Sequence, residues 1–318
     1  MVFENEQRLD LHTVRIVRAI AESGSITGAA RALGFSQPAV SQHLQRTEAR
    51  LGLALVTRAG RSVRLTEAGL VLARHALAIT SALDAAEGDL ADLAGLRSGT
   101  VRLAAFPTAS STIVPRLLAA LAAHHPGIRV TYIEAEPPEA VQLLREGGAD
   151  LAITFSYPGD RTDPHRDSAG GLTAQPLFTE ETVMVMPAAH PLADDTQVDV
   201  ARLAGDRWIA GCPRCRGHLL AVCDVAGFSP VIAFETDNAS AVLNMVASGL
   251  GVAMLPRLAL ATATLPAGVT IRPHSPRSVR SIQALANHGA GGVPSLVATA
   301  AALRALDGSD WGLVAAGS

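Results

Sequence analysis

The sequence predicts an α/β protein with a small helical module and a β-hairpin wing at its N-terminus. Three observations lead to this expectation. Residues 10–66 show three short helical patterns and then a hairpin, residues 66–96 hold no proline, and residues from 100 onward alternate between strand and helix patterns. The 318 residues exceed what one core usually serves, so we expect two or three domains.

The composition is that of a globular protein. Hydrophobic residues make up 48% of the chain and aromatic residues only 3%, so we expect cores built from Ala, Val and Leu. No apolar run approaches the roughly 20 residues of a membrane span, and the polar N-terminus does not resemble a secretory signal. Three cysteines do not suggest a disulfide framework. These features predict a cytoplasmic protein without a membrane partner.

The charge is unevenly distributed. The whole chain carries a net charge of −3, and its 26 basic residues are all arginine. Residues 1–68 hold nine Arg against six Asp and Glu, which leaves the N-terminal module positive and the remainder negative. A small basic module joined to a larger acidic one predicts two different kinds of partner.

The first three helical patterns have clear start and stop signals. Asp10, Ser25 and Ser36 stand where N-caps are needed, and Gly24 and Gly34 end the first two patterns. Apolar residues recur at helical spacing within each pattern. We therefore expect a helix, a short turn and a second helix in the arrangement of a helix-turn-helix.

The third pattern begins "SQPAVSQHLQR" and combines a proline with a row of uncharged polar side chains. The proline falls in the first turn, where a missing N–H breaks no hydrogen bond. Gln suits adenine edges in a major groove, and a helix N-terminus favours a phosphate oxygen. The alternative is an ordinary solvated face. The candidate DNA-binding residues on this face are Ser36, Gln37, Pro38, Ser41, Gln42, Gln45 and Arg46.

The stretch "VTRAGRSVRLT" predicts two short strands around residues 59–61. Arg58, Arg61 and Arg64 lie on this hairpin, where they could bind phosphates and reach an adjacent minor groove. A solvated hairpin is the alternative interpretation. Together the helix pair and the hairpin predict a winged helix-turn-helix.

The proline-free stretch that follows predicts one long helix. Leucines recur near heptad spacing, and such a stripe on an isolated helix needs a partner helix. A dimer is therefore expected. The leucines of the stripe are Leu70, Leu77, Leu83, Leu90 and Leu93.

The chain resembles the LysR-type transcriptional regulators. The resemblance rests on "SITGAARALGFSQPAVSQHLQRTEARLG" and "TRAGRSVRLTEAG", and the pattern of the remaining chain also fits. It implies DNA contacts at Gln37, Pro38, Ser41 and Gln42 and a phosphate contact at Arg58. Two positions depart from the family. Gln42 replaces the usual Arg, and Thr47 places a polar atom where the family usually packs Leu.

The resemblance also implies a division of the chain and a set of partners. The effector-binding part would consist of two Rossmann-like lobes similar to periplasmic binding proteins, with a small molecule between them. Double-stranded DNA, a tetramer of this chain and RNA polymerase are the implied macromolecular partners. The expected segments are a DNA-binding domain at 1–66, a linker helix at 67–96, an effector-binding domain at 97–306 (lobe I at 97–177 and 269–306, lobe II at 178–268) and a loose tail at 307–318.

Two polar segments follow strands in the α/β region, namely "AAFPTASSTIVP" and "FETDNAS". Hydroxyls and free N–H groups at a helix start suit a carboxylate, and open α/β sheets bind ligands at the carboxyl ends of strands. Simple helix capping is the alternative. The candidate effector-binding residues are Thr108, Ser110, Ser111, Thr112, Gly211, Cys212, Thr236, Asp237 and Asn238.

The segment "GCPRCRGHLLAVC" leaves three interpretations open. Cys212 and Cys215 could form a redox pair at a helix N-terminus, beside arginines that lower a thiol pKa. Together with His218 and Cys223 they could instead bind a soft metal. The third interpretation is packing alone, because Cys223 falls at an apolar position of its helix.

Three functions follow from these patterns. The first is a DNA-binding regulator whose activity is modulated by a small molecule in the cleft between the lobes, and the second is the same regulator with the thiol pair or a metal as its input. The third is a cytosolic small-molecule-binding protein or an enzyme. We find no G-x-G-x-x-G, P-loop or G-x-S-x-G segment, so we expect neither an enzyme nor a bound cofactor.

Overall fold

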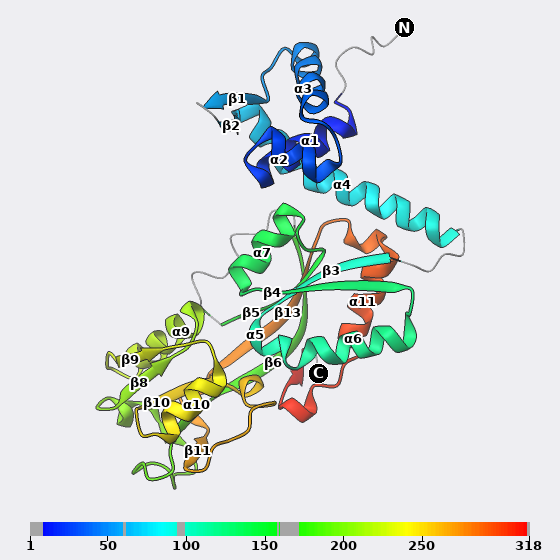
Figure 1. Cartoon of the computed structure of the whole chain (residues 1–318). Helices are drawn as coiled ribbons and strands as arrows, with labels where there is room; N and C mark the ends of the chain where they lie inside the picture. Colours follow the sequence, from blue (N-terminus) through cyan, green and yellow to red (C-terminus); the bar gives the residue numbers. More distant parts are fainter. Residues whose placement is uncertain (1–8, 60–61, 94–98, 158, 160–171, 317–318) are drawn as a thin grey trace. The chain divides into compact units, whose positions relative to one another are not determined.

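The computed structural model describes residues 9–59, 62–93, 99–157, 159 and 172–316. The chain divides into two compact units, the first formed mainly by residues up to 96 and the second mainly by residues from 97 onward. Figure 1 shows the elements of both units, coloured along the sequence. Within the described residues, no helix is both long enough and apolar enough to span a membrane.

The N-terminal unit is a winged helix-turn-helix, as predicted. Asp10 caps the first helix by accepting from the Thr13 N–H at 2.8 Å, and Ser25 caps the second by accepting from the Gly28 N–H at 3.0 Å. Gly24 and Gly34 end these helices in the left-handed conformation that glycine adopts without strain. The elements are α1 (Leu11–Ser23), α2 (Ile26–Leu33), α3 (Gln37–Leu51), β1 (Val56–Ala59), β2 (Ser62–Leu65) and α4 (Glu67–Leu93).

The core of this unit joins α1, α2, α3 and the first turns of α4. Val17, Val40 and Leu44 are at most 1% exposed within it. Thr47 is also buried, and its hydroxyl shares a hydrogen bond of 3.0 Å with the Thr13 hydroxyl. The polar atom that departs from the family pattern therefore has a partner, which removes the usual cost of burying it.

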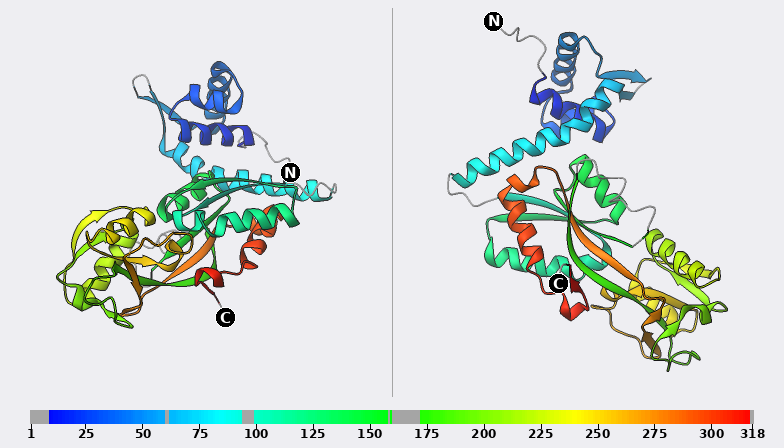
Figure 2. Two further views of the ribbon diagram at one scale, coloured as in Figure 1. Left: turned by 60° about the horizontal axis from the view of Figure 1, so that its bottom comes forward. Right: turned by 180° about the vertical axis from the view of Figure 1, so that it is seen from behind.

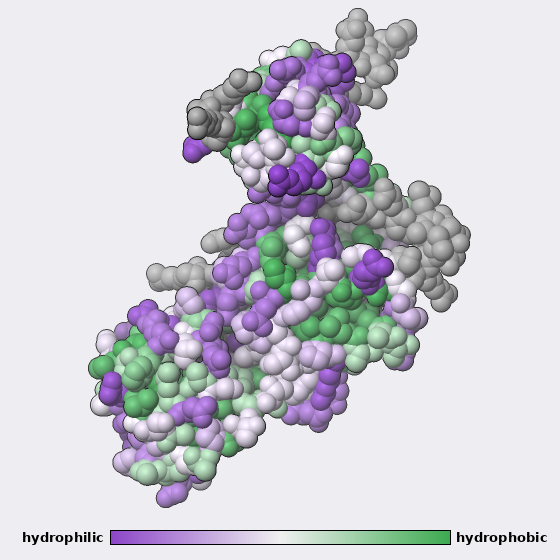
Figure 3. Space-filling model, viewed as in Figure 1, coloured by the Kyte–Doolittle hydropathy of each residue, from purple (hydrophilic) through white to green (hydrophobic). Residues whose placement is uncertain are grey.

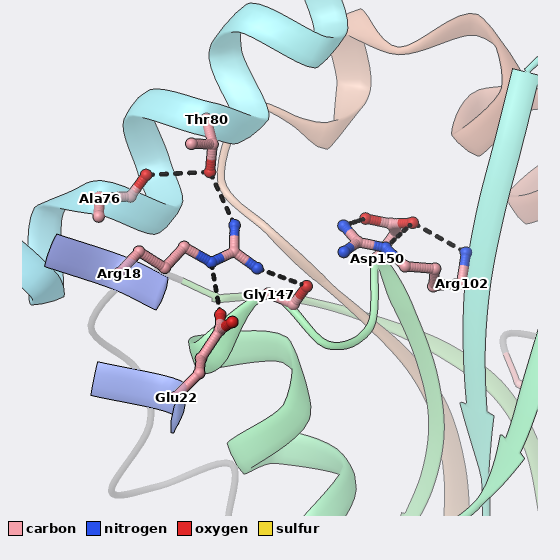
Figure 4. A network of polar contacts seen from close by, with 7 residues as sticks. All are labelled: Arg18, Glu22, Ala76, Thr80, Arg102, Gly147 and Asp150. Atoms are coloured by element: carbon pink, nitrogen blue, oxygen red, sulfur yellow. Dashed lines mark hydrogen bonds and ion pairs between the residues drawn. The ribbon is translucent and has the colours of Figure 1, made fainter. Parts of the chain in front are cut away.

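A polar network ties α1 to α4 (Figure 4). The Arg18 guanidinium pairs with Glu22 one turn further along α1 at 2.8 Å, and it donates to the Thr80 hydroxyl at 3.0 Å. Thr80 in turn donates to the Ala76 carbonyl within α4 at 3.0 Å. The middle of the long helix is thus fixed to α1 by one charge-assisted bond, from Arg18 to Thr80, in addition to the apolar packing of its first turns.

Helix α4 has more apolar surface than one chain covers. Leu72 and Ala76 are buried in the core of the unit, whereas Leu70, Val71 and Ile79 are 50%, 41% and 39% exposed. Of the predicted leucine stripe, the side chains at positions 77, 90 and 93 lie outside the described part. The exposed residues fit a helix that packs against a partner helix.

The second unit is built on one sheet of ten strands. The sheet order is β4-β3-β5-β13-β6-β10-β8-β9, and β11 and β14 also pair with β6. Its larger strands are β3 (Gly99–Ala105), β4 (Ile128–Glu134), β5 (Leu151–Ser156), β6 (Leu172–Pro187), β8 (Arg207–Ala210), β9 (Val231–Glu235), β10 (Val252–Pro256), β11 (Val269–Arg272) and β13 (Val279–Asn287). Its helices of nine or more residues are α6 (Ile113–His124), α7 (Pro137–Glu146), α9 (Pro213–Val225), α10 (Ala239–Ala247) and α11 (Pro294–Arg304).

Two lobes share this sheet, and Figure 2 shows the long strands that run from one into the other. Strand β3 pairs with β4 and β5 in parallel in lobe I, and β8 pairs with β9 and β10 in parallel in lobe II. The crossing strands β6 and β13 are antiparallel to β10 and β5 respectively. Strand pairing is therefore parallel in the outer part of each lobe and antiparallel wherever β6 or β13 takes part.

Each lobe has its own apolar core. In lobe I, α7 packs on the sheet through Ala140 and Leu144, which are fully buried. In lobe II, Trp208 and Cys223 are fully buried on one side of the sheet, and Val246 is fully buried on the other.

Apolar side chains also gather on the surface over β4 and α6 (Figure 3), where Ile133 is 49% exposed. An ion pair of Arg102 with Asp150 joins β3 to the start of β5 (Figure 4).

The C-terminal segment is ordered against lobe I, so the expectation of a loose tail from 307 onward is wrong. The short helix η4 (Ser309–Trp311) and strand β14 (Val314–Ala315) follow α11, and β14 pairs with β6 through Val314 and Thr179. Trp311 is 8% exposed, with the Arg116 guanidinium 4.1 Å from its ring centroid. The indole and the cation anchor a segment that has almost no helical or strand pattern of its own.

Candidate functional site

The first candidate surface is the outer face of α3. Ser36 caps the helix by accepting from the Ala39 N–H at 3.4 Å, and Pro38 occupies the first turn without costing a hydrogen bond. The Gln37 amide donates to the Ser41 hydroxyl at 2.8 Å, which holds its amide in one orientation. Three further candidate side chains on this face are exposed, namely Gln42, Gln45 and Arg46.

The wing places Arg64 on β2 with its side chain exposed. Val63 faces Arg58 in the antiparallel register of β1 and β2, so position 58 lies on the same hairpin. The side chain of Arg58 and the whole of Arg61 lie outside the described residues. The described wing therefore offers one exposed cation beside α3.

The second candidate site is a cavity between the two lobes of the α/β unit, with a volume of about 50 Å³. Its wall brings together five of the nine predicted effector residues. Those five are Thr108, Gly211, Cys212, Thr236 and Asp237. The wall also contains Phe106, Glu136, Phe155, Cys215 and Arg280.

The four remaining predicted effector residues bond to nearby backbone. Ser110 and Thr112 donate to the carbonyls of Phe106 and Thr108, at 3.0 and 2.6 Å. Ser111 donates to the same Thr108 carbonyl at 3.2 Å, and the Asn238 side chain accepts from the Ala241 N–H to cap α10. These side chains act as local caps and are not among the residues that line the cavity.

Two thiols meet at the N-terminus of α9. Cys212 is the N-cap residue and Cys215 lies in the first turn, which brings their sulfur atoms to 3.3 Å. The thiol of Cys212 donates to Cys215, and this bond, with the Arg280 guanidinium and the Tyr157 hydroxyl, outweighs burial and lowers the pKa of Cys215 to about 7. The same bond and burial raise the pKa of Cys212. One thiolate beside one thiol is the expected state near neutral pH.

Arg280 supplies a fixed positive charge to the cavity. It lies on β13 with its side chain 2% exposed, and its Nε donates to Glu180 at 2.6 Å. Its Nη2 donates to the Thr108 hydroxyl at 3.0 Å, and its guanidinium lies 4.4 Å from the Phe155 ring centroid. Burial lowers the pKa of Arg280, but Glu180, Tyr157 and Cys215 more than restore it, so the group stays charged.

Glu180 links this charge to lobe II. Its side chain on β6 is fully buried, and its second oxygen accepts from the Leu258 N–H at 2.7 Å. Each carboxylate oxygen therefore has a partner, one on β13 and one just after β10. A fully bonded buried pair of this kind fixes the place where the crossing strands pass each other.

Tyr157 contacts the Cys215 thiol and packs against His218. The Tyr157 hydroxyl donates to the Cys215 sulfur at 3.6 Å, and its ring stacks on the His218 imidazole at 3.8 Å between centroids. His218 is hydrogen-bonded to the buried Ser278 hydroxyl. Burial raises the pKa of Tyr157, so this phenol remains a donor to the thiolate.

Glu136 enters the wall from lobe I, immediately before α7. One of its carboxylate oxygens is buried without a hydrogen-bond partner. Burial and the neighbouring Cys212 and Asp237 raise the pKa of Glu136 to about 8, although Arg280 opposes them. The carboxyl group is therefore protonated at neutral pH and available as a hydrogen-bond donor.

The four-ligand metal interpretation does not fit this geometry. Cys223 packs in the core of lobe II, where burial raises its pKa to about 11, and His218 stacks on Tyr157. In the part of the chain that the structure describes, no three His, Cys, Asp or Glu side chains are grouped to hold a metal ion. The cysteine segment thus presents two thiols to the cavity and the third to the core.

Four residues of the site were not predicted from the sequence, namely Glu136, Tyr157, Glu180 and Arg280, and His218 was considered as a metal ligand. A signal exists for Arg280, because Ile282 and Ala284 show which face of β13 is buried and position 280 lies on that face. An arginine at an inward position of a strand is a candidate site residue. The partner Glu180 lies 100 residues earlier, and no local pattern connects the two.

Both parts of the chain match known protein families. Residues 11–70 match the family of bacterial regulatory helix-turn-helix proteins of the lysR family, and residues 94–307 match the LysR substrate binding domain. A probable hydrogen peroxide-inducible genes activator of Mycobacterium avium is 34% identical over 251 residues, which are 78% of each chain. The transcriptional dual regulator GltC of Bacillus subtilis is 26% identical, over 86% of this chain and 89% of its own.

Solved structures show the same fold. A full-length OxyR variant from Pseudomonas aeruginosa covers 94% of this chain and 96% of its own, with a TM-score of 0.70 and 24% identity. An H2O2-bound OxyR mutant of Corynebacterium glutamicum covers 94% and 93%, with a TM-score of 0.57 and 24% identity. The two family matches together cover most of the chain, which therefore belongs to the LysR family of transcriptional regulators.

Proposed function

We propose that this LysR-type regulator takes its input as an oxidant of the hydroperoxide class at the Cys212–Cys215 pair. The observation that carries the proposal is the 3.3 Å separation of the two sulfur atoms at the wall of the interlobe cavity. The lowered pKa of Cys215 provides a thiolate near neutral pH, and the thiolate is the form that attacks oxidants.

The chemistry needs only the two thiols and the oxidant. The Cys215 thiolate attacks one peroxide oxygen, the O–O bond breaks, and the other oxygen leaves as an alcohol or water after it gains a proton. The Cys212 sulfur then attacks the resulting sulfenic acid, so that an S–S bond forms and the hydroxide leaves with the Cys212 proton as water. Both sulfurs are oxidised and the peroxide is reduced by the same two electrons.

The size of the cavity favours such an input. One water molecule needs roughly 10–15 Å³ of this kind of space, and a drug-sized ligand needs roughly 300–1,000 Å³. The cavity of about 50 Å³ accommodates a molecule of a few atoms. The names of the Mycobacterium avium relative and of the H2O2-bound OxyR mutant support the same class of oxidant.

Thiol counting tests the proposal. One equivalent of hydrogen peroxide is expected to remove two of the three thiols of the reduced protein and to change its footprint on the DNA that flanks its own gene. Cys212→Ser and Cys215→Ser should each abolish the footprint change. Cys223→Ala is the matched control, because its thiol lies in the lobe II core, and it should respond as the parent does. A full response in Cys215→Ser would exclude the dithiol as the input.

A small organic anion is the second candidate input. The Arg280 guanidinium, the Thr108 hydroxyl and the Thr236 side chain lie around the same cavity and could hold a carboxylate. This candidate requires the lobes to open beyond the observed volume. It predicts that Cys215→Ser keeps an effector-dependent footprint, which separates it from the dithiol.

For DNA binding, we infer that the exposed face of α3 contacts base edges and that Arg64 on the wing binds a phosphate. Gln42→Ala is expected to reduce discrimination between operator and mismatched DNA by about 1–3 kcal/mol. Arg64→Ala should weaken binding to all DNA alike and reduce the salt slope by about 1. Fluorescence anisotropy at several salt concentrations measures both quantities. An equal loss of discrimination in the two variants would contradict this division.

The remaining partners are proposed from the family. Exposed Leu70, Val71 and Ile79 on α4 support self-association through this helix, and we propose a tetramer as the working assembly. Light scattering of the purified chain measures its mass directly. RNA polymerase is the proposed partner at the promoter, and we propose a cytoplasmic location, where the protein would meet chromosomal DNA.

A further inference from the structure

We propose that Glu136 is the proton donor for oxidation of the Cys212–Cys215 pair and holds the negative charge of the cavity once the disulfide has formed. The inference rests on the proposed function and adds a residue that the thiol chemistry does not by itself require. Glu136 belongs to lobe I, whereas both thiols belong to α9 in lobe II. The transfer therefore moves a charge from one lobe to the other.

The position of Glu136 supports this role. Its carboxyl group lines the same small cavity as Cys212, Cys215 and Arg280, and the Cys212 thiol is one of the groups that raise its pKa. One of its oxygens is buried and has no partner, so it can meet a molecule inside the cavity. Its main-chain N–H donates to the Glu139 side chain at 3.1 Å, which fixes the backbone at this point.

The charges around Glu136 explain why it keeps its proton before oxidation and loses it afterwards. The groups that face it are Cys212 and Cys215 on α9, Asp237 before α10 and Arg280 on β13. While Cys215 is a thiolate, its negative charge disfavours a second anion in the cavity. Disulfide formation removes that anion, and Arg280 together with the N-terminus of α7 then favours a carboxylate at Glu136.

The step balances in protons and charge. The peroxide oxygen that leaves during attack by the Cys215 thiolate takes the Glu136 proton and becomes an alcohol or water. The Cys212 proton leaves with the hydroxide of the sulfenic acid as water. A thiolate, a thiol, a carboxylic acid and a hydroperoxide become a disulfide, a carboxylate, an alcohol and water, with one negative charge before and after.

Proton uptake at about pH 7.5 tests the proposal. At this pH Cys215 is mainly a thiolate, and oxidation of a thiolate and a thiol by hydrogen peroxide to a disulfide and two waters takes up one proton. An acid in the cavity that supplies this proton removes the uptake from solution, so the wild-type protein should take up almost no proton per disulfide. A pH-indicator dye in weak buffer measures the uptake, and thiol counting measures the disulfide.

Three variants sharpen this test. Glu136→Gln keeps the size and polarity of the side chain but has no proton to give, so it should take up about one proton per disulfide and should react with peroxide about 10²-fold more slowly. Glu136→Asp keeps an ionisable group and should again remove the uptake. Glu134→Gln is the matched control, an exposed glutamate two residues earlier on β4, and should behave as the wild type.

The outcomes are distinguishable. Normal disulfide formation with equal proton uptake in wild type and Glu136→Gln would overturn the role of Glu136 and leave the dithiol sensor standing. Normal disulfide formation with uptake of one proton by the wild type would overturn it equally. If peroxide forms no disulfide in the wild-type protein, the proposed function itself fails and the role of Glu136 fails with it.

Discussion

Replacing Glu180 by leucine is expected to lower the free energy of unfolding of the α/β unit by about 3–5 kcal/mol, because it leaves the Arg280 charge buried without its partner. The two side chains are 0% and 2% exposed, so solvent cannot compensate for the loss. The Leu258 N–H also loses its acceptor. Urea unfolding followed by tryptophan fluorescence measures the change, since Trp208 and Trp311 both lie in this unit.

A neighbouring residue provides the control for this variant. Glu181 follows Glu180 on β6 but pairs with Arg277, which is 73% exposed, so Glu181→Leu should cost no more than about 1 kcal/mol. The double variant Glu180→Leu with Arg280→Met should recover most of the stability, because both charges are removed together. It should nevertheless raise the pKa of Cys215, which loses the Arg280 guanidinium. Equal costs for Glu180→Leu and Glu181→Leu would contradict the buried ion pair.

Replacing Gly69 by alanine is expected to destabilise the DNA-binding unit by about 3 kcal/mol, because a new methyl group would overlap main-chain atoms. A Cβ at this position would stand 2.1 Å from the carbonyl oxygen of Leu55. That oxygen accepts a hydrogen bond from the Thr66 N–H at 3.0 Å, which holds it in place. The first turn of α4 would have to move away from the segment that leads into β1.

Hydrogen exchange of the α1–α3 amides, together with operator affinity, measures this effect. We expect faster exchange and weaker DNA binding in Gly69→Ala. Gly217→Ala is the matched control, since no atom lies within 4 Å of the added methyl and the residue is inside α9. This control should gain about 0.4–1 kcal/mol. Unchanged exchange in Gly69→Ala would show that the backbone yields more easily than the close approach suggests.

The sequence predicted local structure best where a capping residue and a helical period agree. Helix α2 begins after Ser25 and ends before Gly34, as expected from those two residues. Strand β6 begins at Leu172, although its apolar run starts only at Val183. Its first half has a polar, irregular pattern, and pairing partners that lie far along the chain keep it extended. Trp311 shows the same limit, because a tertiary contact orders the C-terminal segment.

The candidate site was predictable only in part. The motif Cys-x-x-Cys after a strand indicated the thiol pair, and the strand ends indicated Thr108 and Asp237. The charges that set the chemistry of the pair come from β13 and from the start of α7, which lie far from the cysteines in the chain. No spacing rule joins residues that meet only after the lobes have formed. The pKa of Cys215 is therefore a property of the tertiary structure.

Most of lobe II is one continuous segment of the chain, which leaves lobe I and returns to it. The chain leaves β6 after Pro187 and returns at Gly268, whose carbonyl accepts from the Ala188 N–H at 2.7 Å. The excursion from 188 to 268 thus begins and ends at this main-chain bond, directly beside the ladder between β6 and β11. Insertions in its outer loops leave the anchoring ends in place, whereas a length change in β6 would displace both lobes at once. A recombinant graft that exchanges this excursion could give a new sensing chemistry to an unchanged first lobe.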